Sequence, residues 1–242
     1  MTGRTYPPRG LHGEVVESIA LRILRGDLAP GQALPNADDL STELKVSRTL
    51  IREAIKVLAA KGLLESRPKT GTRVRARSDW SLLDPDVLAW TYEAKPDVQF
   101  LRNVTEVRRI VEPAGAALAA TRATHEDVIA MELAYDQMRQ RAKRGEGFIE
   151  ADISFHTAIL AASHNELLDR MTSAISAGLS VSGNVTRQLM GAASASMPLH
   201  YAVLQAVQRK SPGAAQTAMQ QLIRRASMNI ERALKTRSEE TA

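Results

Sequence analysis

The stretch ADISFHTAIL, residues 151–160, places two polar side chains in an apolar setting. Asp152 and His156 are four residues apart, so on a helix they share one face about one turn apart. Phe155 and Ile159 beside them are typical of a buried helix face. A carboxylate and an imidazole at this spacing can serve a catalyst, a metal site or a ligand sensor. The choice among these three depends on the rest of the chain.

The composition predicts a globular protein with a real core. The 242 residues are 44% hydrophobic, which is enough for one large domain or two ordinary ones. Cysteine is absent, so disulfide bonds and thiol chemistry are excluded and a metal site would have to use histidines and carboxylates. The opening MTGRTYPPRG lacks the apolar run of a secretion signal, and no window approaches the roughly 18 apolar residues of a membrane span. We therefore expect a soluble, cytoplasmic protein without a membrane partner.

The formal charge of +5 is unevenly distributed along the chain. Residues 1–77 contain 14 Lys and Arg against 8 Asp and Glu, whereas residues 78–242 contain 18 against 19. A basic module joined to a nearly neutral one favours a polyanion-binding domain, most often for nucleic acid, on a second domain with another task. A solvated basic surface would give the same counts, so the pattern within the first 77 residues is needed to choose.

That pattern predicts a winged helix-turn-helix. GEVVESIALRILRGDL carries a helical stripe of apolar residues that Gly26 ends, and ADDLSTELK is a short second helix. Ser47 is placed as the N-cap of a third helix over RTLIREAIKVLAAKGLL. Two short strand-like segments follow in LLESRPKTGTRVRAR. Because a recognition helix enters the major groove by its N-terminal end, Arg48 and Arg52 are expected to reach the bases, where a bidentate Arg reads guanine.

The wing of this module would have its tip at Gly71. Lys69 and Arg73 on either side of the tip could run along the DNA backbone or enter the minor groove. The residues expected to contact DNA are therefore Arg48, Thr49 and Arg52 on the third helix and Lys69, Gly71 and Arg73 on the wing.

The segment LAPGQALPNADDLSTELKVSRTLIREAIKVLAAKGLLESRPKTGTRV resembles the DNA-binding domain of the GntR family of bacterial repressors. The motifs that carry the resemblance are the P-G-x-x-L-P connector, the S-R-x-x-x-R-E-A recognition helix and the G-L-[LI]-E…G-T-x-V wing. Asn36 departs from the pattern, which usually has Glu or Ser there. The resemblance implies that Arg48 and Arg52 contact bases or phosphates and that Thr49 contacts the backbone.

The remainder, residues 78–242, predicts an all-helical antiparallel bundle of six or seven helices joined by short connections. SDWSLLDPDVLAWTYE is expected to supply the junction and the first of these helices. Glu106–Arg108, EADISFH, SHNELL and MPLH resemble the effector-binding FCD domain of the FadR subfamily. LLDPDVLAWTYE, EVRRIVEPAGAALAATRAT and EADISFHTAIL look closest to regulators of galactonate and other sugar-acid operons.

Many FCD domains bind a divalent metal through an Asp, a His four residues later and two further His on later helices. The resemblance matches the first three ligands to Asp152, His156 and His200 and places the fourth on Leu222. One Asp and two His are still adequate for Zn, Ni or Mn if water or a hydroxy-carboxylate completes the shell. The alternative is that His156 is a bundle histidine satisfied by a hydrogen bond to Asp152.

Two further residues are candidates for binding an effector. By the same resemblance Arg108 points into the cavity of the metal site, where a buried guanidinium could hold a carboxylate. Its alternative role is a salt bridge to Glu112 at i+4. Asn165 is the other candidate, although its position before ELLDRM suits a helix N-cap better.

Three functional classes are compatible with these features: a ligand-responsive transcription factor, a metal-dependent hydrolase or isomerase using Asp152, His156 and His200, and an architectural DNA-binding protein. No nucleophile, second carboxylate or phosphate-binding glycine loop accompanies the three residues, so an enzyme is not favoured. An architectural protein would not require a polar cluster in its bundle. We expect a homodimeric repressor that binds palindromic double-stranded operator DNA and responds to a small carboxylate such as an aldonic or uronic acid. The sequence leaves open the effector, the operator, the metal and the direction of the response.

Overall fold

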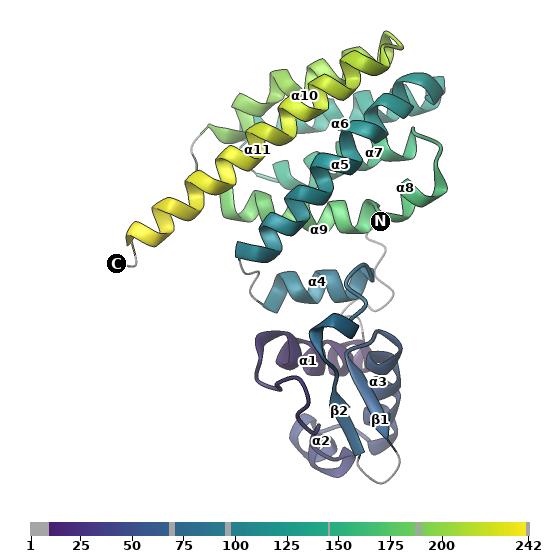
Figure 1. Ribbon diagram of the computed structural model, residues 1–242, viewed down its shortest axis with the longest axis vertical. Helices are drawn as coiled ribbons and strands as arrows, with labels where there is room; N and C mark the ends of the chain where they lie inside the picture. The colour runs from purple at the N-terminus through teal and green to yellow at the C-terminus, as the bar shows by residue number, and fades with distance from the viewer. Residues whose placement is uncertain are drawn as a thin grey trace. The chain divides into compact units, whose positions relative to one another are not determined.

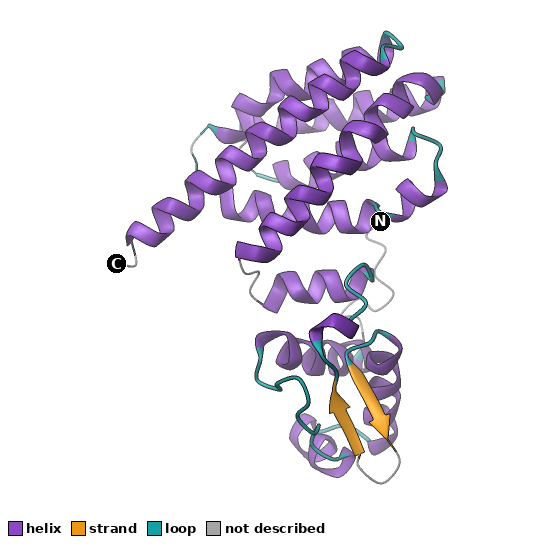
Figure 2. Cartoon of the chain, viewed as in Figure 1, coloured by secondary structure: helices purple, strands orange, loops and turns teal. Residues whose placement is uncertain are grey.

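The computed structural model describes residues 10–67, 71–94, 98–144, 146–186, 189 and 191–240 of the chain. These residues form two compact units that divide between residues 96 and 97. The first unit contains helices and one β-hairpin, and in its described part the second unit is built from helices alone (Figure 1, Figure 2). The predicted fold class, mostly α with an N-terminal winged helix-turn-helix and a C-terminal helical domain, is confirmed.

The first unit has the element order of a winged helix-turn-helix. Its elements are α1 (Leu11–Arg25), α2 (Ala37–Leu44), α3 (Arg48–Ala60), β1 (Leu64–Arg67), β2 (Gly71–Val74), the 3-10 helix η1 (Arg77–Asp79) and α4 (Pro85–Ala94). The strands are antiparallel and pair Leu64 with Val74 at one end and Arg67 with Gly71 at the other. A single bridge between Ala33 and Arg73 ties the connector before α2 to the wing.

Short polar side chains set the starts of α2 and α3, the two helices of the predicted helix-turn-helix. The Asn36 side chain accepts hydrogen bonds from the backbone N–H groups of Asp38 and Asp39, each at 2.9 Å, so the residue that departs from the family pattern is the N-cap of α2. Ser47 Oγ accepts from the N–H of Leu50 at 3.2 Å and caps α3, as predicted. Gly26 ends α1 in the left-handed conformation, φ 89°.

Helix α4 belongs to the first unit. Val87 and Trp90 are fully buried and pack in one hydrophobic core with Ile19 and Leu58, and α4 contacts α1. The sequence counted this helix with the bundle by placing the boundary after residue 77. In the structure residues 78–94 group with the first unit, because apolar side chains such as Trp80, Val87 and Trp90 complete its core.

A buried cluster of charges fixes the start of α4 to the end of α3. Lys61, which follows α3, is 7% exposed, and its Nζ lies 2.8 Å from both carboxylate oxygens of Asp84 and 2.7 Å from Oδ2 of the fully buried Asp86. Asp84 Oδ1 also accepts from the N–H groups of Asp86 and Val87, which caps α4. Burial opposes the charge of Lys61, but the two carboxylates outweigh it and raise the pKa of this residue.

The second unit is a bundle. Its helices are α5 (Val98–Arg122), α6 (His125–Arg144), α7 (Phe148–Ala161), α8 (Glu166–Arg170), α9 (Thr172–Thr186), α10 (Ala192–Gln208) and α11 (Pro212–Glu240). Helix α11 packs against α5 and α10, and α7 packs against α6 and α9 (Figure 1). The largest fully buried side chains of the core include Met131, Met138, Phe155 and Ile159.

Glycines let the helices around Arg108 approach closely. A Cβ at Gly178 of α9 would lie 2.1 Å from a methyl group of Val104 and 3.5 Å from Cδ of Arg108 on α5. A Cβ at Gly115 of α5 would lie 2.6 Å from Leu160 of α7. These contacts bring α9 and α7 against the stretch of α5 that carries Arg108 and Glu112, so this stretch lies deep in the bundle.

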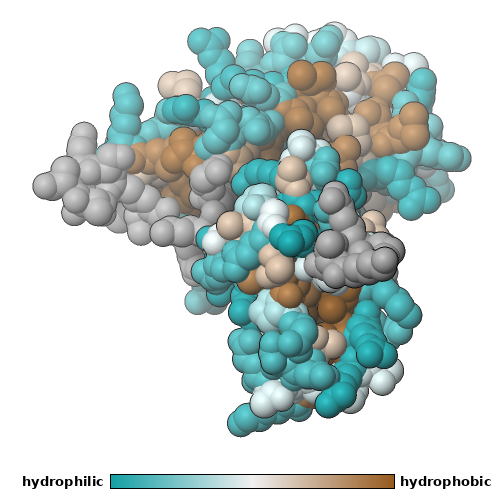
Figure 3. Space-filling model, turned by 60° about the horizontal axis from the view of Figure 1, so that its bottom comes forward, coloured by the Kyte–Doolittle hydropathy of each residue, from teal (hydrophilic) through white to brown (hydrophobic). Residues whose placement is uncertain are grey.

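The surface of the protein is mixed in character. Hydrophobic residues interrupt the hydrophilic surface in Figure 3, and the exposed large hydrophobic side chains of the second unit include Ile110 at 74%, Leu133 at 58% and Met228 at 59%. Among the described residues, none of the helices combines the length and the apolar character that crossing a bilayer requires.

Replacing Lys61 with Met should destabilise the first unit by about 3–5 kcal/mol, because the charge of Asp86 would be left buried without its counter-charge. Urea unfolding followed by tryptophan fluorescence measures this, since both tryptophans of the chain, Trp80 and Trp90, lie in that unit. Glu43→Ala is the control, because it removes the exposed Arg22–Glu43 pair at 3.0 Å and should cost about 1 kcal/mol at most. Equal losses in the two variants would contradict the role given to Lys61.

Candidate functional site

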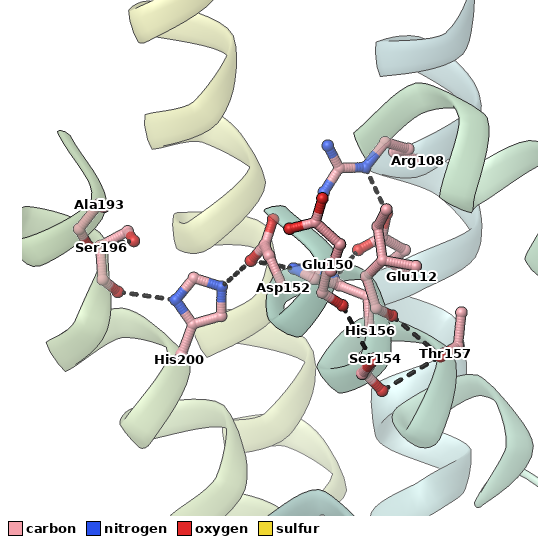
Figure 4. A network of polar contacts seen from close by, with 11 residues as sticks. Arg108, Glu112, Glu150, Asp152, Ser154, His156, Thr157, Ala193, Ser196 and His200 are labelled. Atoms are coloured by element: carbon pink, nitrogen blue, oxygen red, sulfur yellow. Dashed lines mark hydrogen bonds and ion pairs between the residues drawn. The ribbon is translucent and has the colours of Figure 1, made fainter. Parts of the chain in front are cut away.

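Asp152 and His156 on α7 and His200 on α10 form a polar cluster inside the second unit. One ligand atom from each of the three lies within 4.8 Å of the other two. His200 Nε2 is 2.8 Å and His156 Nε2 is 3.6 Å from the same oxygen, Oδ1 of Asp152. Asp152 lies between His200 on one side and His156, Glu112 and Arg108 on the other (Figure 4). The structure therefore brings together the three residues that the sequence predicted as metal ligands.

Both histidines turn the same ring nitrogen toward the cluster. His200 Nδ1 is 2.9 Å from the carbonyl oxygen of Ser196, an atom that can only accept, so Nδ1 carries a hydrogen. His156 Nδ1 is 2.5 Å from Oε2 of Glu112, an ion-pair approach without the alignment of a good hydrogen bond. A carbonyl or carboxylate on one ring nitrogen is the usual partner of a histidine that binds metal through the other.

Apolar packing holds the two rings in place. The Phe155 ring, fully buried, meets the ring of His156 edge-on at 5.9 Å and that of His200 at 5.3 Å between centroids. Each histidine is itself only 2% exposed. The two imidazoles are therefore held in orientation at a place shielded from water, where interactions between charges are stronger than at the surface.

Arg108 and Glu112 extend the cluster on α5. The side chain of Arg108 is 2% exposed and that of Glu112 is 1% exposed, and Arg108 Nε donates to Glu112 Oε1 at 2.5 Å. The i+4 salt bridge that the sequence offered as the alternative role of Arg108 is therefore present. Glu112 also approaches His156 with its other oxygen, so one carboxylate contacts both the candidate effector residue and a candidate metal ligand.

The buried Glu112 and the half-buried Asp152 both stay ionised in this network. Burial works against the charge of Asp152, but the hydrogen bond with His200 and the charges of His156, His200 and Arg108 hold its pKa at about 2. Burial also opposes the charge of Glu112, and the charges of Arg108 and His156 hold its pKa at about 2 as well. At neutral pH both groups are thus carboxylates, the form that binds a metal ion or orients a histidine.

The first unit exposes most of the residues predicted to contact DNA. Arg48, Thr49 and Arg52 are exposed at the N-terminal end of α3. Arg48 Nε makes a 2.6 Å ion pair with Asp38 of α2, and both side chains are more than half exposed. Such an exposed pair is weak enough to open when a phosphate or a base approaches.

Of the three wing residues predicted to contact DNA, the two that the structure describes differ in exposure and in their contacts. Gly71, at φ 80°, is exposed at the start of β2. Arg73 is half-buried, and its Nη1 donates to the carbonyl oxygen of Gly31 at 2.9 Å, so it holds the connector before α2. Lys69 lies outside the described residues. Contact of all three with DNA stays a prediction.

Comparison with known proteins identifies the family. Residues 11–74 match the bacterial regulatory proteins of the gntR family, and residues 103–225 match the FCD domain. The chain belongs to the GntR family. As a GntR-family regulator it has a DNA-binding unit and an effector-binding unit, and the prediction of a transcriptional regulator in place of an enzyme is confirmed.

Relatives support the same assignment. The chain is 39% identical over 162 residues to the galactonate operon transcriptional repressor of Escherichia coli K12, covering 67% of this chain and 71% of that one. It is 34% identical over 212 residues to the uncharacterized HTH-type transcriptional regulator YieP of the same strain, covering 87% and 91%. The solved structure of Lar from Listeria monocytogenes is similar in fold, with a TM-score of 0.69, 16% identity, and coverage of 93% of this chain and 98% of that one.

Two positions in this GntR-family protein have structural roles. Leu222, where the resemblance placed a fourth ligand, is 4% exposed and packs in the hydrophobic core of the bundle. Asn165 Oδ1 accepts from the N–H groups of Leu167 and Leu168 at 3.0 and 3.3 Å, so it caps α8, the alternative that its sequence position favoured. A role of Asn165 in effector binding stays a prediction.

Sequence reasoning missed the second contact of Glu112 and the carbonyl of Ser196. The i+4 spacing from Arg108 pointed to Glu112 as a salt-bridge partner, but no spacing indicates that a residue of α5 reaches His156 on α7. Ser196 precedes His200 by four residues, so on a helix its carbonyl lies one turn below the ring, and this signal was present.

Proposed function

We propose that this GntR-family regulator represses a catabolic operon for a sugar acid or a related carboxylate. The observation that carries the proposal is the convergence, inside the bundle, of a metal-type donor set with a buried guanidinium, Arg108. The relative named for the galactonate operon adds support, because it is 39% identical over 162 residues.

The donor set fits a divalent metal ion such as Zn, Ni or Mn. One carboxylate oxygen and two imidazole nitrogens are the ligand types these ions accept, and both rings have an acceptor on the opposite nitrogen. Leu222 offers no ligand atom, which leaves part of the coordination shell to water or to an effector oxygen. When bound, the ion would supply a position for a hydroxyl or carboxylate oxygen of the effector.

Arg108 would hold the carboxylate of the effector. Its Nε is engaged by Glu112, so its two terminal nitrogens are the pair suited to bidentate contact with a second carboxylate. Its charge contributes to the low pKa of Asp152, which places the guanidinium within electrostatic reach of the donor set. An acid bound between Arg108 and the donor set would thus be recognised at two points.

DNA binding would use a two-fold dimer on a palindromic operator. One recognition helix and one wing give a small contact area, and two copies double it while matching the symmetry of the site. Ile110, Leu133 and Met228 are among the exposed apolar side chains of the second unit that a partner copy could cover. The acid regulates transcription only if it binds the operator-competent and incompetent dimers unequally.

The effector class is tested by calorimetry with D-galactonate, D-gluconate and D-glucuronate. We expect at least one acid to bind and to change the affinity for DNA from upstream of the protein's own gene. Arg108→Lys should weaken that binding about tenfold or more, because Lys keeps the charge but loses the planar pair of donors. Arg109→Lys, on the exposed face of the same turn, should leave it unchanged. Binding of none of the acids, or equal affinities in the two variants, would contradict the proposal.

The DNA interface is tested on α3. Replacing Arg48 or Arg52 with Ala should weaken specific operator binding by about 1–3 kcal/mol per half-site, since each loses a base contact at the groove. Much of the salt-dependent binding to unrelated DNA should remain. Arg25→Ala removes an exposed charge at the end of α1 and serves as the control in a gel-shift titration. If both variants bind the operator as tightly as the wild type, Arg48 and Arg52 do not make the proposed base contacts.

A further inference from the structure

We propose that Glu112 is a positioning residue that sets the orientation of both halves of the effector site. It would direct Nε2 of His156 toward the metal position and hold the guanidinium of Arg108 beside it. The proposal rests on the proposed function, because it names the residue that prepares the same site.

The carboxylate of Glu112 is the link between two helices. Its Oε1 is 2.5 Å from Nε of Arg108 on α5, and its Oε2 is 2.5 Å from Nδ1 of His156 on α7. All three side chains are no more than 2% exposed. In so buried a place each contact is made with little competition from water, so the geometry of the carboxylate controls both partners.

For His156, the contact with Glu112 determines which of the two ring nitrogens carries the hydrogen. Oε2 of Glu112 can only accept, so at this ion-pair distance we expect Nδ1 to be the ring nitrogen that carries the hydrogen. Nε2 of the neutral ring then presents its lone pair toward Asp152 and His200, which is the form that binds a metal ion. An amide in place of the carboxylate could offer an N–H to Nδ1 and so favour the other form, with the hydrogen on Nε2.

For Arg108, the contact with Glu112 affects the orientation of the guanidinium group. The hydrogen bond from Nε to Glu112 restrains the guanidinium and leaves its two terminal nitrogens to contact a second carboxylate. Burial limits other orientations as well, since Arg108 is only 2% exposed. The preorganised guanidinium loses less conformational freedom when a carboxylate binds.

A purely structural role would make Glu112 no more than a counter-charge for Arg108. That role predicts a loss of stability in Glu112 variants but no particular form of His156 and no change in metal affinity beyond the loss of folded protein. The positioning role predicts changes in both properties in the folded variant. The two roles therefore differ in what NMR and metal titration would show.

The first measurement uses the metal-free wild type. Nitrogen-15 NMR of the histidine side chains, followed as the pH is raised until the ring is neutral, should show His156 with its hydrogen on Nδ1. In Glu112→Gln the population with the hydrogen on Nε2 should increase. A neutral wild-type ring with its hydrogen on Nε2 would overturn the proposal without the use of any variant.

The second measurement is zinc affinity, obtained by competition with a chromophoric chelator. Glu112→Gln should bind zinc about 10–100-fold more weakly than the wild type, the usual effect of losing the partner of a metal-binding histidine. Glu106→Gln, on the exposed face of α5, should match the wild type. Equal zinc affinity in wild type and Glu112→Gln would overturn the proposal.

Two outcomes separate this proposal from the proposed function. If the wild type binds no zinc, the metal part of the proposed function fails, and the NMR result alone then supports or overturns the positioning role. If Glu112→Gln does not fold, Arg108→Met/Glu112→Gln removes both buried charges together. A wild-type zinc affinity in that folded double variant would also overturn the role of Glu112.

Discussion

Pairing of buried charge is the constraint on which both units depend. A charged group taken out of water costs several kcal/mol unless a partner of opposite charge and good geometry is present. In the first unit Lys61 lies against Asp84 and Asp86, and this joins α4 to the recognition helix. In the second unit Arg108, Glu112 and His156 form a chain of contacts between α5 and α7 that ends at Asp152. Hydrophobic residues of similar size can often replace a buried ion pair without loss of stability, so stability alone does not explain why such charges are present.

The two clusters differ in what they can do. The first is closed, because the ammonium of Lys61 is surrounded by two carboxylates and by the ring of Trp90 at 5.8 Å. The second cluster contains more potential ligand atoms than can pair with one another. Two imidazole nitrogens, Nε2 of His156 and of His200, approach the same oxygen, Oδ1 of Asp152. Three such atoms facing one point are costly without a cation or a proton between them, and this cost is what an ion would relieve.

Local signals predicted the ends of helices correctly, whereas contacts between residues far apart in the chain were not predicted. Ser47 caps the start of α3 and Gly26 ends α1 as predicted, because capping depends on neighbours a few residues away. The sequence counted α4 with the bundle, and the contact of Lys61 with Asp84 spans 23 residues. The DNA contact of Arg73 stays a prediction, and its hydrogen bond to Gly31, 42 residues earlier, was not foreseen.

The site shows the same division. Helical spacing related Asp152 to His156, but His200 is 48 residues from Asp152 and came only from resemblance to the family. Glu112 was foreseen as a partner of Arg108 because i+4 spacing is local. Its approach to His156 depends on how closely α5 and α7 pack, a distance set by residues such as Gly115 and Leu160 that carry no chemistry of their own.

The central claim, that the buried charges form a metal centre, is tested most directly by anomalous X-ray diffraction at the zinc edge from crystals grown with zinc. The account predicts a peak about 2.0–2.2 Å from an oxygen of Asp152 and from Nε2 of both His156 and His200. Zinc bound elsewhere on the protein, with this cluster in place and no peak between its three side chains, would contradict it.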